Sequence, residues 1–72
     1  MMTSMKKYAL VKCYPQKEGG MNVTLANCIA SSFEMAVRTL QQDSPVKLNE
    51  NGYAKRNEFT WVVCSVYDPI FA

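Results

Sequence analysis

The stretch 27–40 limits the fold more than any other, because it holds the only segment with helical periodicity. Its apolar residues recur at the spacing that places side chains on one face of a helix: Phe33, Ala36, Val37 and Leu40. Ser31 is a natural N-cap, and Glu34 three residues later completes a capping box. Because Asp43-Ser44-Pro45 stops a helix, the sequence predicts a single helix over about residues 32–42.

Strand patterns flank this helix on both sides. Alternating segments rich in β-branched and aromatic residues cover 8–14, 21–30, 46–50 and 59–67. Gly19-Gly20 predicts a hairpin loop between the first two segments, and a shift of phase at Leu25-Ala26 predicts a β-bulge. Asn51-Gly52 predicts a second hairpin, after which residues 53–58 return as a strand or form a polar loop.

The order of these elements is strand, strand, helix, strand, strand. It predicts a single α+β domain over residues 1–72, with an antiparallel sheet of about four strands and one helix packed on one face. A chain of 72 residues has room for only a small core.

The composition argues against several classes of function. The chain has no histidine, which excludes histidine-based acid–base and nucleophilic chemistry. Cys13, Cys28 and Cys64 lie too far apart for a metal knuckle, and we expect three reduced core thiols in a cytoplasmic protein. No apolar run approaches the roughly 20 residues of a membrane helix. We therefore expect no catalytic residues, no metal, no cofactor and no membrane partner.

One helix covers only one face of such a sheet, yet segments 8–14 and 59–67 are apolar on both faces. We expect the helix to cover one set of side chains: Ala9, Val11, Cys13, Val62, Cys64 and Val66. The opposite set then forms an uncovered aromatic surface: Tyr8, Leu10, Tyr14, Phe59, Trp61 and Val63. Three occupants of that surface stay open, namely the chain's own terminal segments (the first methionines and Ile70-Phe71), a second copy in a homodimer, or a different macromolecule.

Basic residues surround the predicted Asn51-Gly52 hairpin, and a second group lies on the first strand at Lys6, Lys7 and Lys12. A basic hairpin beside a tyrosine is suited to weak contact with nucleic acid, although Glu50 and Glu58 dilute its charge. The candidate partner-binding residues combine this hairpin with the uncovered face: Lys47, Tyr53, Lys55, Arg56, Tyr14, Phe59 and Trp61.

The chain as a whole resembles the very small α+β proteins of phages, including one of the type I-F anti-CRISPR families. The resemblance rests on the opening Met5-Lys6-Lys7-Tyr8-Ala9-Leu10-Val11 strand, on residues 30–38 at the helix start, on Asn51-Gly52, and on a strand containing tryptophan. It implies a stoichiometric inhibitor that binds a host defence complex through its sheet and loops. The family's contact residues are not carried over to this chain.

The leading expectation is therefore a non-enzymatic phage or mobile-element protein that acts in the cytoplasm of the host cell. It binds and inhibits a host protein or ribonucleoprotein complex, of which a nucleic-acid-handling CRISPR effector is the example that the resemblance suggests. The alternatives are a small nucleic-acid-binding protein that uses the basic hairpin, and a homodimeric accessory or structural subunit.

Overall fold

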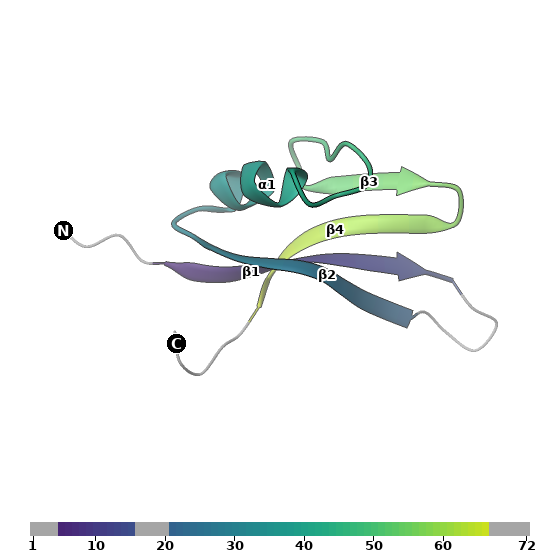
Figure 1. Cartoon of the computed structure of the whole chain (residues 1–72), viewed down its shortest axis with the longest axis horizontal. Helices are drawn as coiled ribbons and strands as arrows, with labels where there is room; N and C mark the ends of the chain where they lie inside the picture. Colours follow the sequence, from purple (N-terminus) through teal and green to yellow (C-terminus); the bar gives the residue numbers. More distant parts are fainter. Residues whose placement is uncertain (1–4, 16–20, 67–72) are drawn as a thin grey trace.

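A computed structural model of the chain describes residues 5–15 and 21–66, with the side chain of Met21 left aside. It contains β1 (Lys6–Tyr14), β2 (Met21–Ala30), α1 (Phe33–Gln41), β3 (Tyr53–Arg56) and β4 (Phe59–Val66). The four strands form one antiparallel sheet in the order β2-β1-β4-β3, which confirms the predicted α+β fold (Figure 1). The Gly19-Gly20 loop and the predicted folding back of the terminal segments lie outside the described residues.

The predicted bulge is present in β2. Leu10 of β1 pairs with Ala26, and the next residue, Val11, pairs with Thr24, so Leu25 is the extra residue. An extra residue in one strand bends that strand and increases its local twist. The bulge reconciles the two alternating patterns of β2 and keeps both halves of the strand paired with β1.

The second predicted hairpin is wrong in its position. Residues 46–50 form no strand, and Asn51-Gly52 lies in the connection that leads from α1 into β3. The true hairpin joins β3 to β4 through Asn57-Glu58, with Arg56 paired to Phe59. Asn57 adopts φ 58°, a left-handed conformation that asparagine tolerates better than most residues.

Asn49 holds the turn that the sequence suggested as a hairpin. Its side-chain oxygen Oδ1 accepts hydrogen bonds from the backbone N–H groups of Asn51, at 2.9 Å, and Tyr53, at 3.0 Å. Its carbonyl accepts from the N–H of Gly52 at 2.9 Å, and the carbonyl of Gly52 then accepts from the N–H of Val63 at 2.8 Å. The turn is thereby fixed against β4 and delivers the chain into β3.

The helix begins one residue later than predicted. Ser32, not Ser31, is the N-cap, and its hydroxyl accepts a hydrogen bond from the N–H of Met35 at 3.2 Å. The helical stripe is confirmed at Ala36, Val37 and Leu40, which are buried. Phe33 on the same face is 38% exposed, and its ring lies edge-on to that of Tyr8, with the ring centroids 6.1 Å apart.

The helix packs on the face of the sheet opposite to the one expected. The core unites the helical stripe with Tyr8, Leu10, Trp61 and Val63, the set that was predicted to stay uncovered. The reason lies in β2, whose small residues Ala26 and Cys28 stand opposite Leu10 and Tyr8 on that face. Small side chains there let the helix approach the sheet closely, so the larger residues of β1 and β4 fill the core beneath it.

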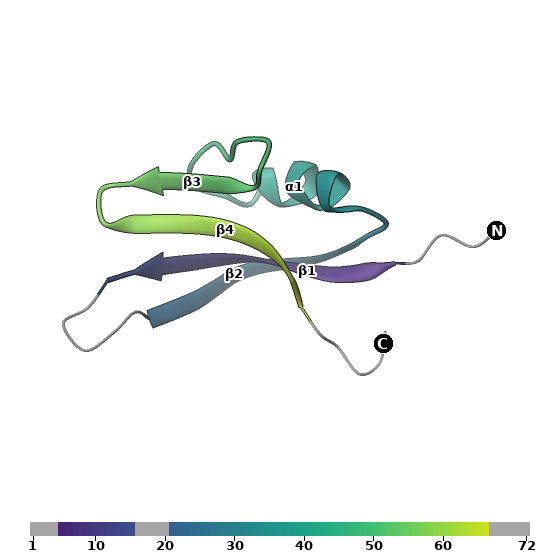
Figure 2. The ribbon, with the colours of Figure 1, turned by 180° about the vertical axis from the view of Figure 1, so that it is seen from behind.

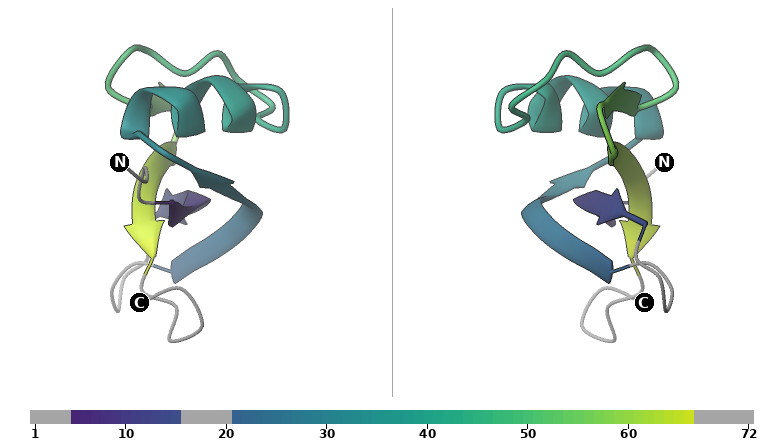
Figure 3. Two further views of the ribbon diagram at one scale, coloured as in Figure 1. Left: turned by 90° about the vertical axis from the view of Figure 1, so that its left-hand side faces the viewer. Right: turned by 90° about the vertical axis from the view of Figure 1, so that its right-hand side faces the viewer.

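The helix covers only one half of this face. Figures 1 and 2 show α1 over the end where β1 begins and β2 ends, while the strands run on beyond it toward the β3–β4 turn. Figure 3, which looks at the sheet from its two ends, shows its strong twist and the helix on one side of it. The half of this face next to the β3–β4 turn is therefore not covered by α1, and we call it the far end of the face.

Candidate binding surface

Four of the predicted binding residues meet at this far end, around Phe59. The Phe59 ring lies edge-on to that of Tyr14, with centroids 5.5 Å apart, and 6.1 Å from that of Trp61. Arg56 is the cross-strand partner of Phe59 in β3. Lys12 of β1 completes the group, since its Nζ atom lies 4.2 Å from the centroid of the Phe59 ring. We call these five residues the cation–aromatic cluster.

The members of the cation–aromatic cluster differ in exposure. Trp61 is only 4% exposed and belongs to the core, so its predicted place on an uncovered face is wrong. Tyr14, Phe59 and Lys12 are half-buried, and Arg56 is exposed. What a partner can reach is therefore the two cations and the outer parts of two aromatic rings, with Trp61 as the floor beneath them.

Lys12 is the member that sequence reasoning placed in a different group. The sequence pattern groups Lys12 with Lys6 and Lys7 as charges on the first strand, although Lys12 alternates with Leu10 and Tyr14 on an apolar face. The register sets it opposite Trp61, with Nζ 5.9 Å from the indole ring. A cation over aromatic faces gains an electrostatic attraction to the rings. The sequence does contain a signal for this position, namely a lysine that alternates with apolar and aromatic residues along one strand.

The other three predicted residues do not join the cation–aromatic cluster. Tyr53 and Lys55 stand opposite Val62 and Thr60, on the face of the sheet that the helix does not cover. Lys47 is exposed in the connection between α1 and β3. The predicted basic hairpin is thus divided between two faces and a loop, because alternate residues of a strand point to opposite sides.

Charge is distributed unevenly between the strands and the rest of the described chain. The strands contain five cationic side chains and no Asp or Glu: Lys6, Lys7, Lys12, Lys55 and Arg56. The acids that the structure describes lie instead on the helix, the connections and the hairpin turn: Glu34, Asp43, Glu50 and Glu58. Two further cations, Arg38 and Lys47, stand among these acids. Within the described residues, the sheet is therefore the positive part, and both of its faces bear cations.

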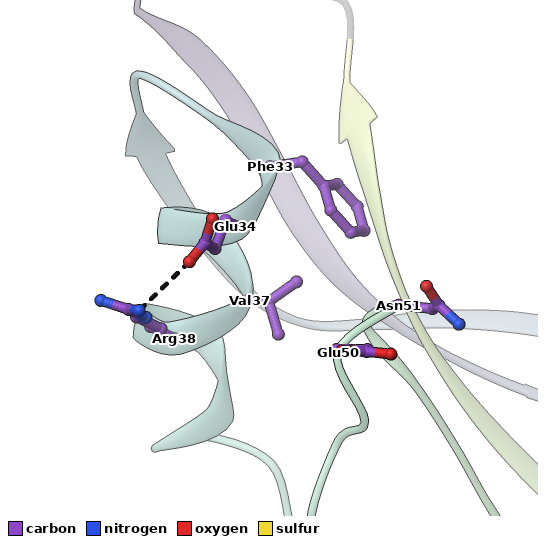
Figure 4. A pocket seen from close by; sticks show the side chains of 6 residues that line it. All are labelled: Phe33, Glu34, Val37, Arg38, Glu50 and Asn51. Atoms are coloured by element: carbon purple, nitrogen blue, oxygen red, sulfur yellow. Dashed lines mark hydrogen bonds and ion pairs between the residues drawn. The ribbon is translucent and has the colours of Figure 1, made fainter.

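A shallow pocket of about 550 Å³ lies between α1 and the turn at residues 49–52 (Figure 4). The side chains that line it are Phe33, Glu34, Val37, Arg38, Glu50 and Asn51. Glu34 and Arg38 form an exposed ion pair at 3.1 Å across one helical turn, with both side chains more than 75% exposed (77% and 78%). Such a pair contributes only a few tenths of a kcal/mol. None of the predicted binding residues lines this pocket.

The three cysteines form no disulfide, as expected, but they are less buried than the core thiols that the sequence predicts. Cys13 and Cys28 are half-buried, whereas Cys64 is exposed on the face away from the helix. Burial, with a smaller contribution from the nearby Asp43 carboxylate, raises the pKa of the Cys28 thiol above its ordinary range. Among the described residues, no three His, Cys, Asp or Glu side chains group closely enough to hold a metal ion.

The described part of the chain contains no helix long and apolar enough to cross a membrane. Comparison of the chain with models of protein families, with curated proteins and with solved structures finds no match.

Proposed function

We propose that this chain is a non-enzymatic binding protein that attaches to an anionic surface of a host macromolecular complex and blocks it. The uneven distribution of charge carries the proposal, since five cations and no acid lie in the described strands. Taken with the resemblance to small phage inhibitors, it favours a nucleic-acid-handling complex in the host cytoplasm, of the CRISPR effector type. The protein then acts as a stoichiometric inhibitor.

The cation–aromatic cluster is the surface we assign to this contact. Lys12 and Arg56 supply two positive charges beside the half-buried rings of Tyr14 and Phe59. Arginine forms planar, two-pronged hydrogen bonds with carboxylates and phosphates, and aromatic rings add apolar contact area at an interface. Because Phe59 packs against both Tyr14 and Trp61, the rings are held in place before a partner arrives.

A comparative pull-down from bacterial lysate tests this assignment. The tagged chain is compared with the double variant Lys12→Glu/Arg56→Glu and with the control Lys47→Glu, which reverses an exposed charge outside the cluster. We expect a defined complex with the unmodified chain and with Lys47→Glu, and its loss with the double variant. Equal recovery of that complex by all three proteins would remove the cation–aromatic cluster from the interface.

Direct binding of nucleic acid is the second candidate, and the same strand cations favour it. Each phosphate neutralised by Lys or Arg releases counterions. For single strands, the logarithm of the binding constant therefore falls by about 0.7 for each phosphate contact when the salt concentration rises tenfold. Fluorescence anisotropy with a short labelled single-stranded RNA and a DNA duplex, read at several salt concentrations, measures this slope. Salt-dependent binding that weakens in the double variant supports the second candidate, and no binding at low salt excludes it.

A further inference from the structure

The two edges of the sheet differ in length and in charge. One edge is β3, which has four residues and ends on the adjacent cations Lys55 and Arg56. Short edge strands with charged side chains are the devices by which proteins prevent pairing with another chain. The other edge is β2, the longest strand, with ten residues.

β2 has none of the charges that protect β3. Its sequence contains no Asp, Glu, Lys, Arg or Pro, and it exposes three large apolar side chains: Val23 (39%), Leu25 (40%) and Ile29 (45%). Among the described residues, β2 pairs with β1 alone, and no other backbone hydrogen bond reaches it. The bulge at Leu25 interrupts this edge, but residues 21–24 and 26–30 on either side of it pair regularly with β1, and the outward N–H and C=O groups of these two runs form a template for a further strand.

We propose that a second copy of this chain supplies that strand, so that two β2 strands pair antiparallel across a two-fold axis. Two four-stranded sheets then become one continuous sheet in the order β3-β4-β1-β2-β2-β1-β4-β3. The dimer brings exposed apolar side chains of β2 beside side chains of the second β2. It leaves the short, charged β3 at both outer edges, so the assembly stops at two copies.

Charge decides between a second copy and a different partner at this edge. The chain carries a net charge of +2, so two copies repel each other wherever their cations meet. Pairing along β2 sets no like charges directly opposite each other, because that strand has none. An anionic macromolecule is drawn instead to β1 and β3, which carry the cations. The inference does not rest on the proposed function, since β2 contributes no residue to the cation–aromatic cluster.

Sedimentation equilibrium of the full chain over a wide concentration range tests the dimer. We expect the unmodified protein to approach twice its 8.1 kDa monomer mass. Ile29→Glu and Val23→Glu each put a charge on an exposed position of β2, opposite Lys7 and Lys12 of β1, and we expect each to weaken the dimer about tenfold or more, because charged side chains on an edge strand oppose pairing with another chain. The control Met35→Glu adds the same charge to an exposed helical position and leaves the dissociation constant within about twofold. A monomer up to millimolar concentration, or equal weakening in all three variants, overturns the proposal.

Hydrogen exchange of the unmodified chain gives a test that needs no variant to fold. We expect amides of β2 to exchange more slowly at a high protein concentration than at a low one, because the second copy protects the outward N–H groups. Amides of β3 show no such dependence. A dimer whose β2 amides exchange at the same rate at all concentrations would place the interface elsewhere.

Discussion

Gly52 lies directly against Val63 of β4, so that a Cβ atom added to the glycine would stand 3.0 Å from the Cβ of Val63. It would also meet the ring of Phe33 at 2.9 Å and the side chain of Val37 at 3.0 Å. The glycine has φ +69°, a conformation that costs other residues about 1 kcal/mol or more. At position 52 the turn packs so closely against the helix and the sheet that a Cβ atom would collide with both.

Gly52→Ala should destabilise the protein by about 2–4 kcal/mol, the sum of the left-handed backbone cost and the overpacking of a closely filled site. Urea denaturation followed by far-UV circular dichroism measures the free energy of unfolding. Asn51→Ala is the matched control at the neighbouring, exposed position and should change that free energy by less than about 0.5 kcal/mol. An alanine at position 52 that costs no more than this control would contradict the close packing.

Asn49→Ala should cost about 1–3 kcal/mol, because it removes the oxygen that accepts from the N–H groups of Asn51 and Tyr53. Asn49→Asp keeps that acceptor and should retain most of the stability. The comparison, made by thermal unfolding at neutral pH, separates the hydrogen bonds from the volume of the side chain. Equal losses in both variants would show that the amide oxygen does not hold the turn.

Ser32→Ala should lower the free energy of unfolding by about 1 kcal/mol, since the hydroxyl caps the helix at the N–H of Met35. Ser31→Ala, one residue earlier, should change it by less than about 0.5 kcal/mol. Chemical denaturation of the two variants side by side decides which serine is the cap. A larger loss at Ser31 would restore the position that the capping-box pattern predicts.

Trp61 should behave as a core residue in solution. We expect blue-shifted fluorescence and weak quenching by acrylamide, because the side chain is 4% exposed. Trp61→Ala should cost about 3–5 kcal/mol and Trp61→Phe clearly less, since the indole Nε1 has no hydrogen-bond partner within the described residues. Red-shifted, readily quenched emission of the native protein would contradict this burial.

The Cys28 thiol should react with iodoacetamide more slowly than the exposed Cys64 at neutral pH. Burial first, and then the charge of Asp43, raise the pKa of Cys28, so less of it is the reactive thiolate. Asp43→Asn should therefore speed the labelling of Cys28 and leave Cys64 unchanged, as mass spectrometry of timed samples can show. Because the raised pKa favours the neutral thiol in the folded state, the stabilisation from this thiol is present below the ordinary pKa of a cysteine and is lost as the pH rises through the raised pKa.

The order of elements, the bulge and the helical stripe could be predicted from the sequence, because each leaves a local pattern. The face that the helix covers could not, because residues 8–14 and 59–67 are apolar on both sides and alternation alone does not rank two apolar faces. Strand pairing supplies the missing information. Once Tyr8 is known to stand opposite Cys28, and Leu10 opposite Ala26, the small residues of β2 mark the face where a helix fits.

The predicted binding residues lie apart in the structure for a related reason. Asn51-Gly52 has the sequence of a hairpin turn, but the side chain of Asn49 and the packing of Gly52 place it before β3 instead. The hairpin then closes six residues later at Asn57, so Tyr53 and Arg56 fall within one strand on opposite faces. A turn motif alone predicts where the chain bends, but not which two elements the bend connects.

The separation of acids from cations bears on the proposed approach to an anionic partner. Among the described residues, the strands carry five cations and no acid, while the rest carries four acids and two cations, Arg38 and Lys47, so the described part of the molecule is an electric dipole. In the field of an anionic surface, such a dipole rotates before contact, so the molecule arrives with its strand cations foremost. The rate of productive encounter then rises in dilute salt and falls as the Debye length shortens, even where the final contact is mostly apolar.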